Sequence, residues 1–186
     1  MAQPRTDTRA SRPRRARAAG IAGALVIAVF AAVTARVFIW PVVQPLPEHA
    51  DAIIELGGPG EADRDRVALK LAREHRAPLL IQSTRRGDTA CLPPVGGVSV
   101  ECFYADPNTT RGEARHIGLE AAKRHWRSVI LVTTPDQIWR ADLRVSRCFP
   151  GMIYNATAHL PWQDWFVVIP YQWAASIKAL TVERAC

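Results

Sequence analysis

Two short segments of this chain carry side chains that could do chemistry together. The first, Thr-Thr-Arg-Gly-Glu-Ala-Arg, contains Thr110 and Glu113, and the second contains Thr134, Gln137 and Arg140. Hydroxyl, amide and guanidinium groups can hold an anion, and a carboxylate can accept a proton as a general base. We therefore expect Arg140 to hold an anion, the two threonines to orient it, and Glu113 to act as the base.

Two glycines and a serine extend the expected site. Glycines after a strand let the backbone approach a ligand closely, and Ser83 offers a hydroxyl at the end of the next strand. The candidate ligand-binding residues read from the pattern are Gly57, Gly58, Ser83, Thr110, Thr134, Gln137 and Arg140, and the candidate catalytic residue is Glu113.

Each of these segments also has a purely structural explanation. An ordinary tight turn explains 57–60, because the loop lacks both GxGxxG and the phosphate-binding lysine of a P-loop. Thr110 and Glu113 have the spacing of a capping box. Arg140 could instead pair with an acid such as Glu113 or Asp136 and brace the loops. Arg144, one turn further along, is expected at the surface.

Alternating strands and helices must position these side chains. The hydrophobic pattern predicts strands at 52–56, 78–82, 98–104, 128–134 and 152–154, helices at 61–75, 110–126, 136–147 and 171–183, and no clear element for the aromatic segment 162–169. This order predicts a three-layer, Rossmann-like α/β domain with a mostly parallel sheet. Right-handed crossovers then place every βα loop on one edge of the sheet, where such folds bind ligands.

The N-terminal part of the chain reads as a membrane anchor. Residues 1–17 contain six arginines and one acid, 18–40 form an apolar span, 41–48 a proline-rich linker and 49–186 the α/β domain. Without the tail and Arg36, the chain has 17 basic and 16 acidic residues. The pI of 9.8 therefore comes mostly from the tail and gives no support for nucleic-acid binding. A cleaved signal peptide is the alternative, but the span exceeds a typical h-region, so we favour a retained anchor.

All four cysteines follow the anchor. They show neither CxxC nor a Cys/His cluster, so we expect no bound metal. In an oxidising compartment three disulfide pairings are possible. Cys91 with Cys102 is the first choice, because they flank a short Pro/Gly-rich loop, and Cys148 with Cys186 follows. Isolated buried thiols are the alternative.

Over residues 48–182 the chain resembles the YdcF/SanA/ElyC-like family of bacterial envelope proteins. The resemblance is carried by DAIIxLGG (51–58), RxxxAxxL (64–71), PLLIxS (78–83), TTRGEAR (109–115) and VTTxxQxxRA (132–141). It implies a Rossmann-like fold and a role in envelope integrity or in polysaccharide or lipid-carrier metabolism. By position Arg64 matches the family's polar residues, so the resemblance adds Arg64 to the candidate ligand-binding residues, where it would hold the anion together with Arg140. One family member is reported to bind S-adenosylmethionine, but no general reaction or cofactor follows.

Two positions depart from that family pattern. The usual Ser-Gly-Gly after the second strand is Ser83-Thr84-Arg85 here, and the usual histidine of the last motif is Gln137. A glutamine can hydrogen-bond but cannot act as an acid or base near neutral pH. We therefore expect a membrane-anchored protein that acts on an anionic envelope metabolite, such as a lipid-linked or phosphorylated sugar, or a non-catalytic binding or scaffold protein.

The arginine-rich tail predicts the topology of the chain. Six arginines before an apolar span should hold the N-terminus in the cytoplasm of a bacterium and place 49–186 outside the plasma membrane, in a single pass. Protease added to intact cells or spheroplasts should digest the C-terminal domain. A protected C-terminal domain would contradict both this topology and the expected disulfides.

Overall fold

The computed structural model describes residues 12–85 and 91–186. The first eleven residues of the expected tail, and Arg86 in the loop after Ser83, lie outside this part. The elements follow in the order α1 (Arg12–Thr34), η1 (Ala35–Ile39), β1 (Ala52–Glu55), α2 (Glu61–Arg73), β2 (Leu79–Thr84), β3 (Ser99–Tyr104), α3 (Thr110–Arg124), β4 (Ser128–Thr133), α4 (Pro135–Val145), β5 (Met152–Thr157), η2 (Trp162–Asp164) and α5 (Trp165–Thr181).

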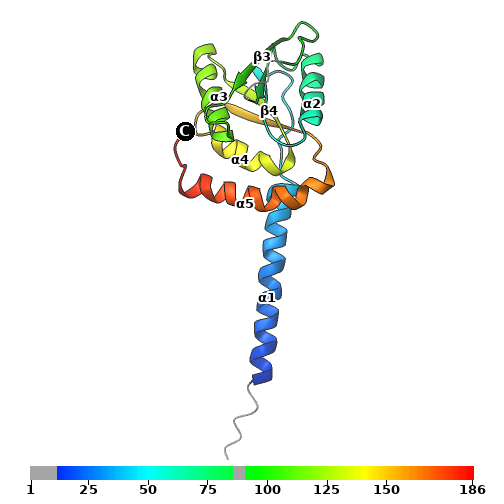
Figure 1. Cartoon of the computed structure of the whole chain (residues 1–186), viewed down its shortest axis with the longest axis vertical. Helices are drawn as coiled ribbons and strands as arrows, with labels where there is room; N and C mark the ends of the chain where they lie inside the picture. The colour runs from blue at the N-terminus through cyan, green and yellow to red at the C-terminus, as the bar shows by residue number, and fades with distance from the viewer. Residues whose placement is uncertain (1–11, 86–90) are drawn as a thin grey trace, which may run out of the picture.

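The strands form one sheet in the order β3-β2-β1-β4-β5, with every pair parallel (Figure 1). The expected three-layer α/β fold is confirmed, and the sheet is entirely parallel. β1 and β4 lie in the centre of the sheet, and nearly all of their residues are buried. Their unbroken apolar runs result from this cover on both faces.

Helices cover the two faces of the sheet unequally. On one face α2 packs Ala68, Leu71 and Ala72 against alternate residues of β1, β2 and β4. On the other face α3 and α4 supply residues such as Ile117 and Val145 to a separate core cluster. α2 follows β1 and α4 follows the adjacent β4, so the chain leaves these neighbouring strands towards opposite faces. This is the topological switch point at which open α/β sheets form a ligand crevice.

The final helix is longer than the sequence pattern predicted. The expected start at Tyr171 is wrong, because α5 begins at Trp165 after the short 3₁₀ turn η2 and contains Pro170 in its interior. Proline removes one hydrogen bond to the carbonyl four residues earlier. That carbonyl belongs to Phe166, which is an exposed residue, so water can take the place of the missing hydrogen-bond donor.

α1 projects from the α/β domain as a single long rod (Figure 1). Among the described residues, Ala16–Ile39 is the stretch long and apolar enough to cross a membrane. It coincides closely with the expected anchor at 18–40. α5 runs across the domain end of this helix and packs against α4.

Both expected disulfides are present. Cys91 pairs with Cys102, and Cys148, just after α4, pairs with Cys186 at the C-terminus. The C-terminal segment is also held to α4 by Arg144, whose guanidinium donates hydrogen bonds to the carboxylate and the backbone carbonyl of Glu183. Arg144 is 4 % exposed, so the expectation of a surface position is wrong. The C-terminal segment covers it, which spacing within α4 alone could not reveal.

The longer disulfide loop should stabilise the fold more than the shorter one. Cys148 and Cys186 are 38 residues apart, whereas Cys91 and Cys102 are 11 apart. The chain-entropy relation gives about 4 kcal/mol for the longer loop and about 3 kcal/mol for the shorter. Urea unfolding of the paired Cys→Ala variants in detergent micelles should show losses in this order. Equal stability of the oxidised and reduced wild type would contradict the prediction.

Candidate functional site

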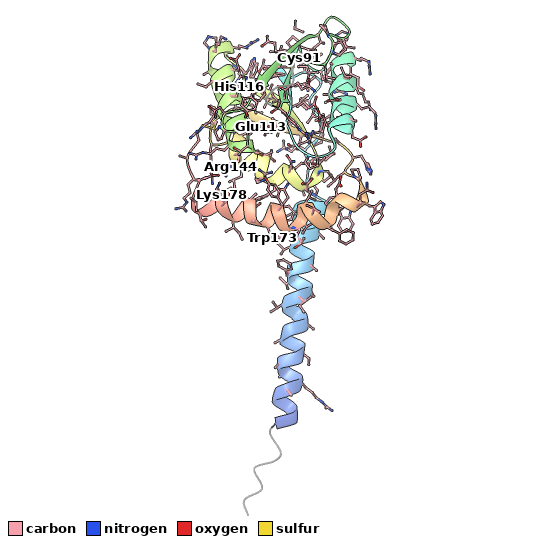
Figure 2. All side chains as sticks on the ribbon, in the orientation of Figure 1. Cys91, Glu113, His116, Arg144, Trp173 and Lys178 are labelled. Atoms are coloured by element: carbon pink, nitrogen blue, oxygen red, sulfur yellow. A yellow bond between two sulfur atoms is a disulfide. The ribbon has the colours of Figure 1, made fainter. Side chains whose placement is uncertain are left out.

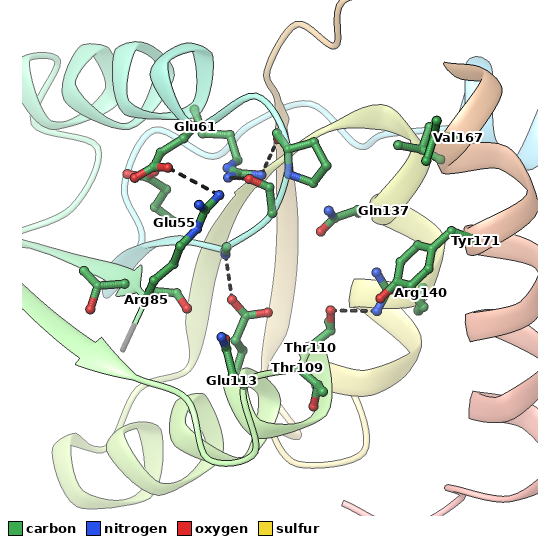
Figure 3. Close-up of a pocket in the computed structure, with 18 residues that line it drawn as sticks. Glu55, Glu61, Arg85, Thr109, Thr110, Glu113, Gln137, Arg140, Val167 and Tyr171 are labelled. Carbon is green, nitrogen blue, oxygen red and sulfur yellow. Dashed lines mark hydrogen bonds and ion pairs between the residues drawn. The ribbon is translucent and has the colours of Figure 1, made fainter. Parts of the chain in front are cut away.

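A cavity of about 430 Å³ opens at the carboxyl edge of the sheet, at the switch point between β1 and β4 (Figure 3). This volume suits a small metabolite. Loops after β1 and β2, the N-terminal turns of α2, α3 and α4, and one side of α5 form its wall. The lining residues are Glu55, Gly57, Gly58, Pro59, Glu61, Arg64, Ser83, Thr84, Arg85, Asn108, Thr109, Thr110, Glu113, Gln137, Arg140, Val167, Val168 and Tyr171.

Glu113 joins α3 to the loop after β1. Its Oε1 accepts a hydrogen bond of 2.6 Å from the backbone N–H of Gly57, and the side chain of Ser83 also hydrogen-bonds to it. The N-cap of α3 is Thr109, whose hydroxyl accepts from the N–H of Gly112. The capping box expected between Thr110 and Glu113 is therefore wrong, and the carboxylate is directed into the cavity.

The surroundings of Glu113 make its carboxylate more basic than usual. Burial raises its pKa, and this effect outweighs the hydrogen bonds from Gly57 and Ser83 and the positive charges of Arg140 and Arg64, which lower it. Catalytic bases are commonly prepared by this kind of burial. Glu113 thus combines a cavity position with a raised pKa, as a general base requires.

Arg140 is held by a chain of side-chain hydrogen bonds. Its Nε donates to Gln172 of α5 over 2.8 Å, and one terminal nitrogen donates to the hydroxyl of Thr110 over 2.7 Å. Gln172 in turn donates to Asp136 over 2.6 Å. The guanidinium also lies over the ring of Tyr171, 5.7 Å from its centroid. The alternative of a direct Arg140–acid pair is not observed among the described hydrogen bonds and ion pairs, because Gln172 stands between Arg140 and Asp136.

Gln137 presents its amide to the glycine loop. Its Oε1 accepts from the hydroxyl of Thr133, which leaves Nε2 directed at Gly58. A Cβ at Gly58 would lie 2.5 Å from that nitrogen, and the residue has a φ of +136°, a conformation that L-residues rarely adopt. Glycine is therefore required here, both by the backbone and by the closeness of Gln137.

Arg64 braces the same loop from below. Its terminal nitrogens donate to the carbonyls of Gly58 and Pro59, the latter over 2.6 Å, and the residue is 1 % exposed. Its Nε has no hydrogen-bond partner among the described residues. Two of its nitrogens thus donate hydrogen bonds to the loop after β1, so Arg64 is better placed to fix the conformation of that loop than to bind an anion by itself.

Glu55 is a cavity residue that the sequence analysis missed. It ends β1, is 2 % exposed and lies beside Asp65 and Arg64. Burial, followed by the hydrogen bond and the negative charge of Asp65, raises the pKa of Glu55 to about 9. Glu55 therefore carries a proton at neutral pH. The one available signal was an acid inside an otherwise apolar strand.

The structure brings together most of the expected site residues. Gly57, Gly58, Arg64, Ser83, Thr110, Glu113, Gln137 and Arg140 all line the cavity. Thr134 does not: it is fully buried behind the N-terminus of α4, and its hydroxyl has no partner among the described residues. The contribution of α5, through Val167 and Tyr171, was also missed, because the sequence placed Tyr171 at the start of a helix with no signal for what it packs against.

The cavity can thus offer a base, hydrogen-bond donors and a cation to one bound molecule. Across residues 12–85 and 91–186, no group of three His, Cys, Asp or Glu side chains is arranged to hold a metal ion. In comparisons with known proteins, no protein-family model, curated protein or solved structure matches the chain. The conclusions below therefore rest on the residues themselves.

Glu55 should make the stability of the fold fall as the pH rises. The unfolded chain ionises this carboxyl near pH 4.5, whereas the folded chain keeps the proton until about pH 9. The stabilisation is complete below pH 4.5 and is lost as the pH rises through 9, by at most about 1.4 kcal/mol per pH unit for one proton.

The neutral variant Glu55→Gln should remove this dependence. In urea unfolding from pH 5 to 9, its free energy of unfolding should fall less steeply than that of the wild type. Glu48→Gln, at an exposed position in the linker, is the control and should parallel the wild type. Parallel curves for wild type and Glu55→Gln would show that Glu55 is ionised in the folded state.

Proposed function

We propose that this chain is a single-pass, membrane-anchored protein whose extracytoplasmic domain binds an anionic cell-envelope metabolite, such as a phosphorylated or lipid-linked sugar, and that Glu113 acts on it as a general base. The observation that carries this proposal is the convergence of Glu113 and Arg140 on one cavity. One residue supplies a basic carboxylate and the other a positive charge in the same enclosed space.

The geometry of Arg140 supports anion binding. Its hydrogen bonds to Gln172 and Thr110 use Nε and one terminal nitrogen, which fixes the plane of the guanidinium. The other terminal nitrogen has no hydrogen bond to the residues that the structure describes. A planar, preoriented guanidinium is suited to phosphate and carboxylate groups. Thr110 and the amide of Gln137 line the same space and would fix the orientation of the ligand.

The charge pattern and the cysteines support the proposed location. An arginine-rich tail before an apolar span favours a cytoplasmic N-terminus. The two disulfides suit an oxidising compartment outside the plasma membrane of a bacterium. A place in envelope maintenance also agrees with the resemblance to the YdcF/SanA/ElyC-like family, which we retain as part of the proposal.

A non-catalytic binding role is the second candidate, and Gln137 is the observation that favours it. The family pattern has a histidine at this position, whereas the amide here cannot exchange a proton near neutral pH, and its oxygen is bound by Thr133. In that case Glu113 would serve only to fix the loop at Gly57. The two roles differ in what the loss of the carboxylate charge should do.

Arg140→Ala should weaken anion binding without unfolding the domain. We would titrate glucose 1-phosphate and farnesyl phosphate into the full chain in nanodiscs, with glucose as the uncharged comparison. Loss of a charge-assisted hydrogen bond of about 1.5–3 kcal/mol predicts roughly a tenfold to hundredfold weaker affinity. Arg124→Ala, which removes an arginine paired with Glu101 and Glu120 on the surface, is the matched control and should bind as the wild type does.

Glu113→Gln separates catalysis from binding. As a base, Glu113 should be required for turnover of any phosphorylated substrate found, while the variant still binds the anion. A variant that keeps full turnover would favour the scaffold role.

For Arg140→Ala, a lowered melting temperature with unchanged anion affinity would show that Arg140 only braces the loops.

A further inference from the structure

The outward face of α5 is more apolar than the face it buries. The outward face comprises Phe166, Pro170, Ala174, Ile177 and Thr181, all exposed, with Phe166 at 76 % and Ile177 at 55 %. Flanking it on the same helix, Val167, Tyr171 and Leu180 are exposed as well. The buried positions are Val168, Gln172, Ser176 and Ala179.

This pattern is the reverse of a helix at the surface of a water-soluble domain. Such a helix turns its apolar stripe to the core and its charged residues to the solvent. α5 instead buries an amide and a hydroxyl and exposes large aromatic and aliphatic side chains. A contiguous apolar surface of this kind marks contact with a protein or a membrane.

The position of α5 identifies which of these it contacts. Trp173 joins α5 to the apolar helix: its ring stacks on Phe30 at 5.3 Å, meets Phe38 edge-on at 5.3 Å, and donates a hydrogen bond of 3.2 Å to Thr34 (Figure 2). α5 therefore lies against the domain end of Ala16–Ile39 and runs across its axis.

The length of the apolar helix places this junction at the lipid surface. Its 24 residues extend about 36 Å, slightly more than a hydrocarbon core of about 30 Å. Phe38, near its end, then reaches the headgroup region, and Thr34, one turn earlier, lies level with the upper acyl chains. Trp40 directly follows the apolar helix and Trp162 lies three residues before α5; they are 71 % and 73 % exposed, and tryptophan is enriched at the membrane–water interface.

We propose that α5 lies in the plane of the membrane–water interface on the side of the bilayer that carries the α/β domain. Its outward face is then buried among lipid headgroups and the upper acyl chains. The inference requires only that Ala16–Ile39 spans the bilayer. Trp173 then joins the span to the interfacial helix, and Lys178, whose side chain is 60 % exposed beside the outward face, pairs its ammonium group with Glu183 at 2.9 Å.

This placement puts the cavity entrance beside the bilayer. Val167 and Tyr171 line the cavity and also border the outward face of α5 (Figure 3). A ligand with a lipid tail could therefore present its phosphate to Arg140 while the tail stays in the membrane. This last consequence rests on the proposed function, whereas the interfacial position of α5 does not.

Spin labels on the full chain test the position of α5. All four cysteines lie in disulfides, so Phe166→Cys and Ile177→Cys each add a single free thiol. Leu119→Cys is the matched control, because Leu119 is an apolar residue 70 % exposed on α3. In nanodiscs of phosphatidylcholine and phosphatidylglycerol, labels at 166 and 177 should be relaxed by oxygen and protected from a water-soluble nickel complex, and the label at 119 should show the reverse.

Two results would overturn the proposal. Labels at 166 and 177 that behave like the label at 119 would place α5 in water. Immobilised labels shielded from both reagents, with dipolar broadening between chains, would show that a second copy covers the outward face.

A double variant separates this inference from the proposed function. Phe166→Ser with Ile177→Ser should weaken binding of vesicle-borne farnesyl phosphate by at least about tenfold and leave glucose 1-phosphate binding unchanged. Unchanged binding of both probes would refute entry from the lipid side. Failure of the wild type to bind either probe would refute the proposed function, while the label accessibilities would still decide the position of α5.

Discussion

The hydrogen bond from the Gly57 N–H to the Glu113 carboxylate links the two halves of the site. It joins the start of α3 to the loop after β1, and both are held in place by the parallel sheet at its switch point. A carboxylate in this buried position is stable only with partners, because an unpaired buried charge is costly. Ser83, Arg64 and Arg140 provide those partners. These groups reach Glu113 from β2, α2 and α4, so the environment of one carboxylate links three elements at the cavity.

A second constraint acts through α5, which connects the site to the apolar anchor. Its buried face carries Gln172, which orients Arg140, and Trp173 on an adjacent face contacts α1. A tilt of α5 would move both side chains together, since one rigid helix holds them. The geometry around Arg140 is thus coupled to the packing of α5 on α1, although α1 and the cavity residues of α4 are far apart in the sequence.

The sequence predicted the features that depend on local patterns, and it failed where distant parts of the chain decide. The strands and most helices, the parallel sheet, both disulfides and the polar residues at the end of β2 and in the first turns of α3 and α4 follow from hydrophobic period, spacing and composition. Thr133 and Thr134 are neighbours in the sequence and both are fully buried, but the hydroxyl of Thr133 bonds to Gln137, whereas that of Thr134 has no partner among the described residues. Arg144 is covered by the C-terminal segment, and α5 continues through Pro170 because it packs on α4 and α1. None of these outcomes can be read from neighbouring residues alone.

The protonation state of Glu55 matters for the proposed binding of an anion in a cavity lined by three glutamates. Three glutamates, Glu55, Glu61 and Glu113, face three arginines, Arg64, Arg85 and Arg140, which suggests neutrality. Glu61 and Arg85 are half-exposed or more and pair with each other at 3.8 Å, so they contribute little. Glu55 is protonated at neutral pH, because burial and Asp65 raise its pKa to about 9. Among the lining residues this leaves Glu113 with Arg64 and Arg140, while Asp65 lies beside Arg64 and the buried Asp136 beside Arg140 just outside the lining. Protonation of Glu55 therefore removes one negative charge from the cavity wall, which lowers the electrostatic cost of the anion binding that we propose there.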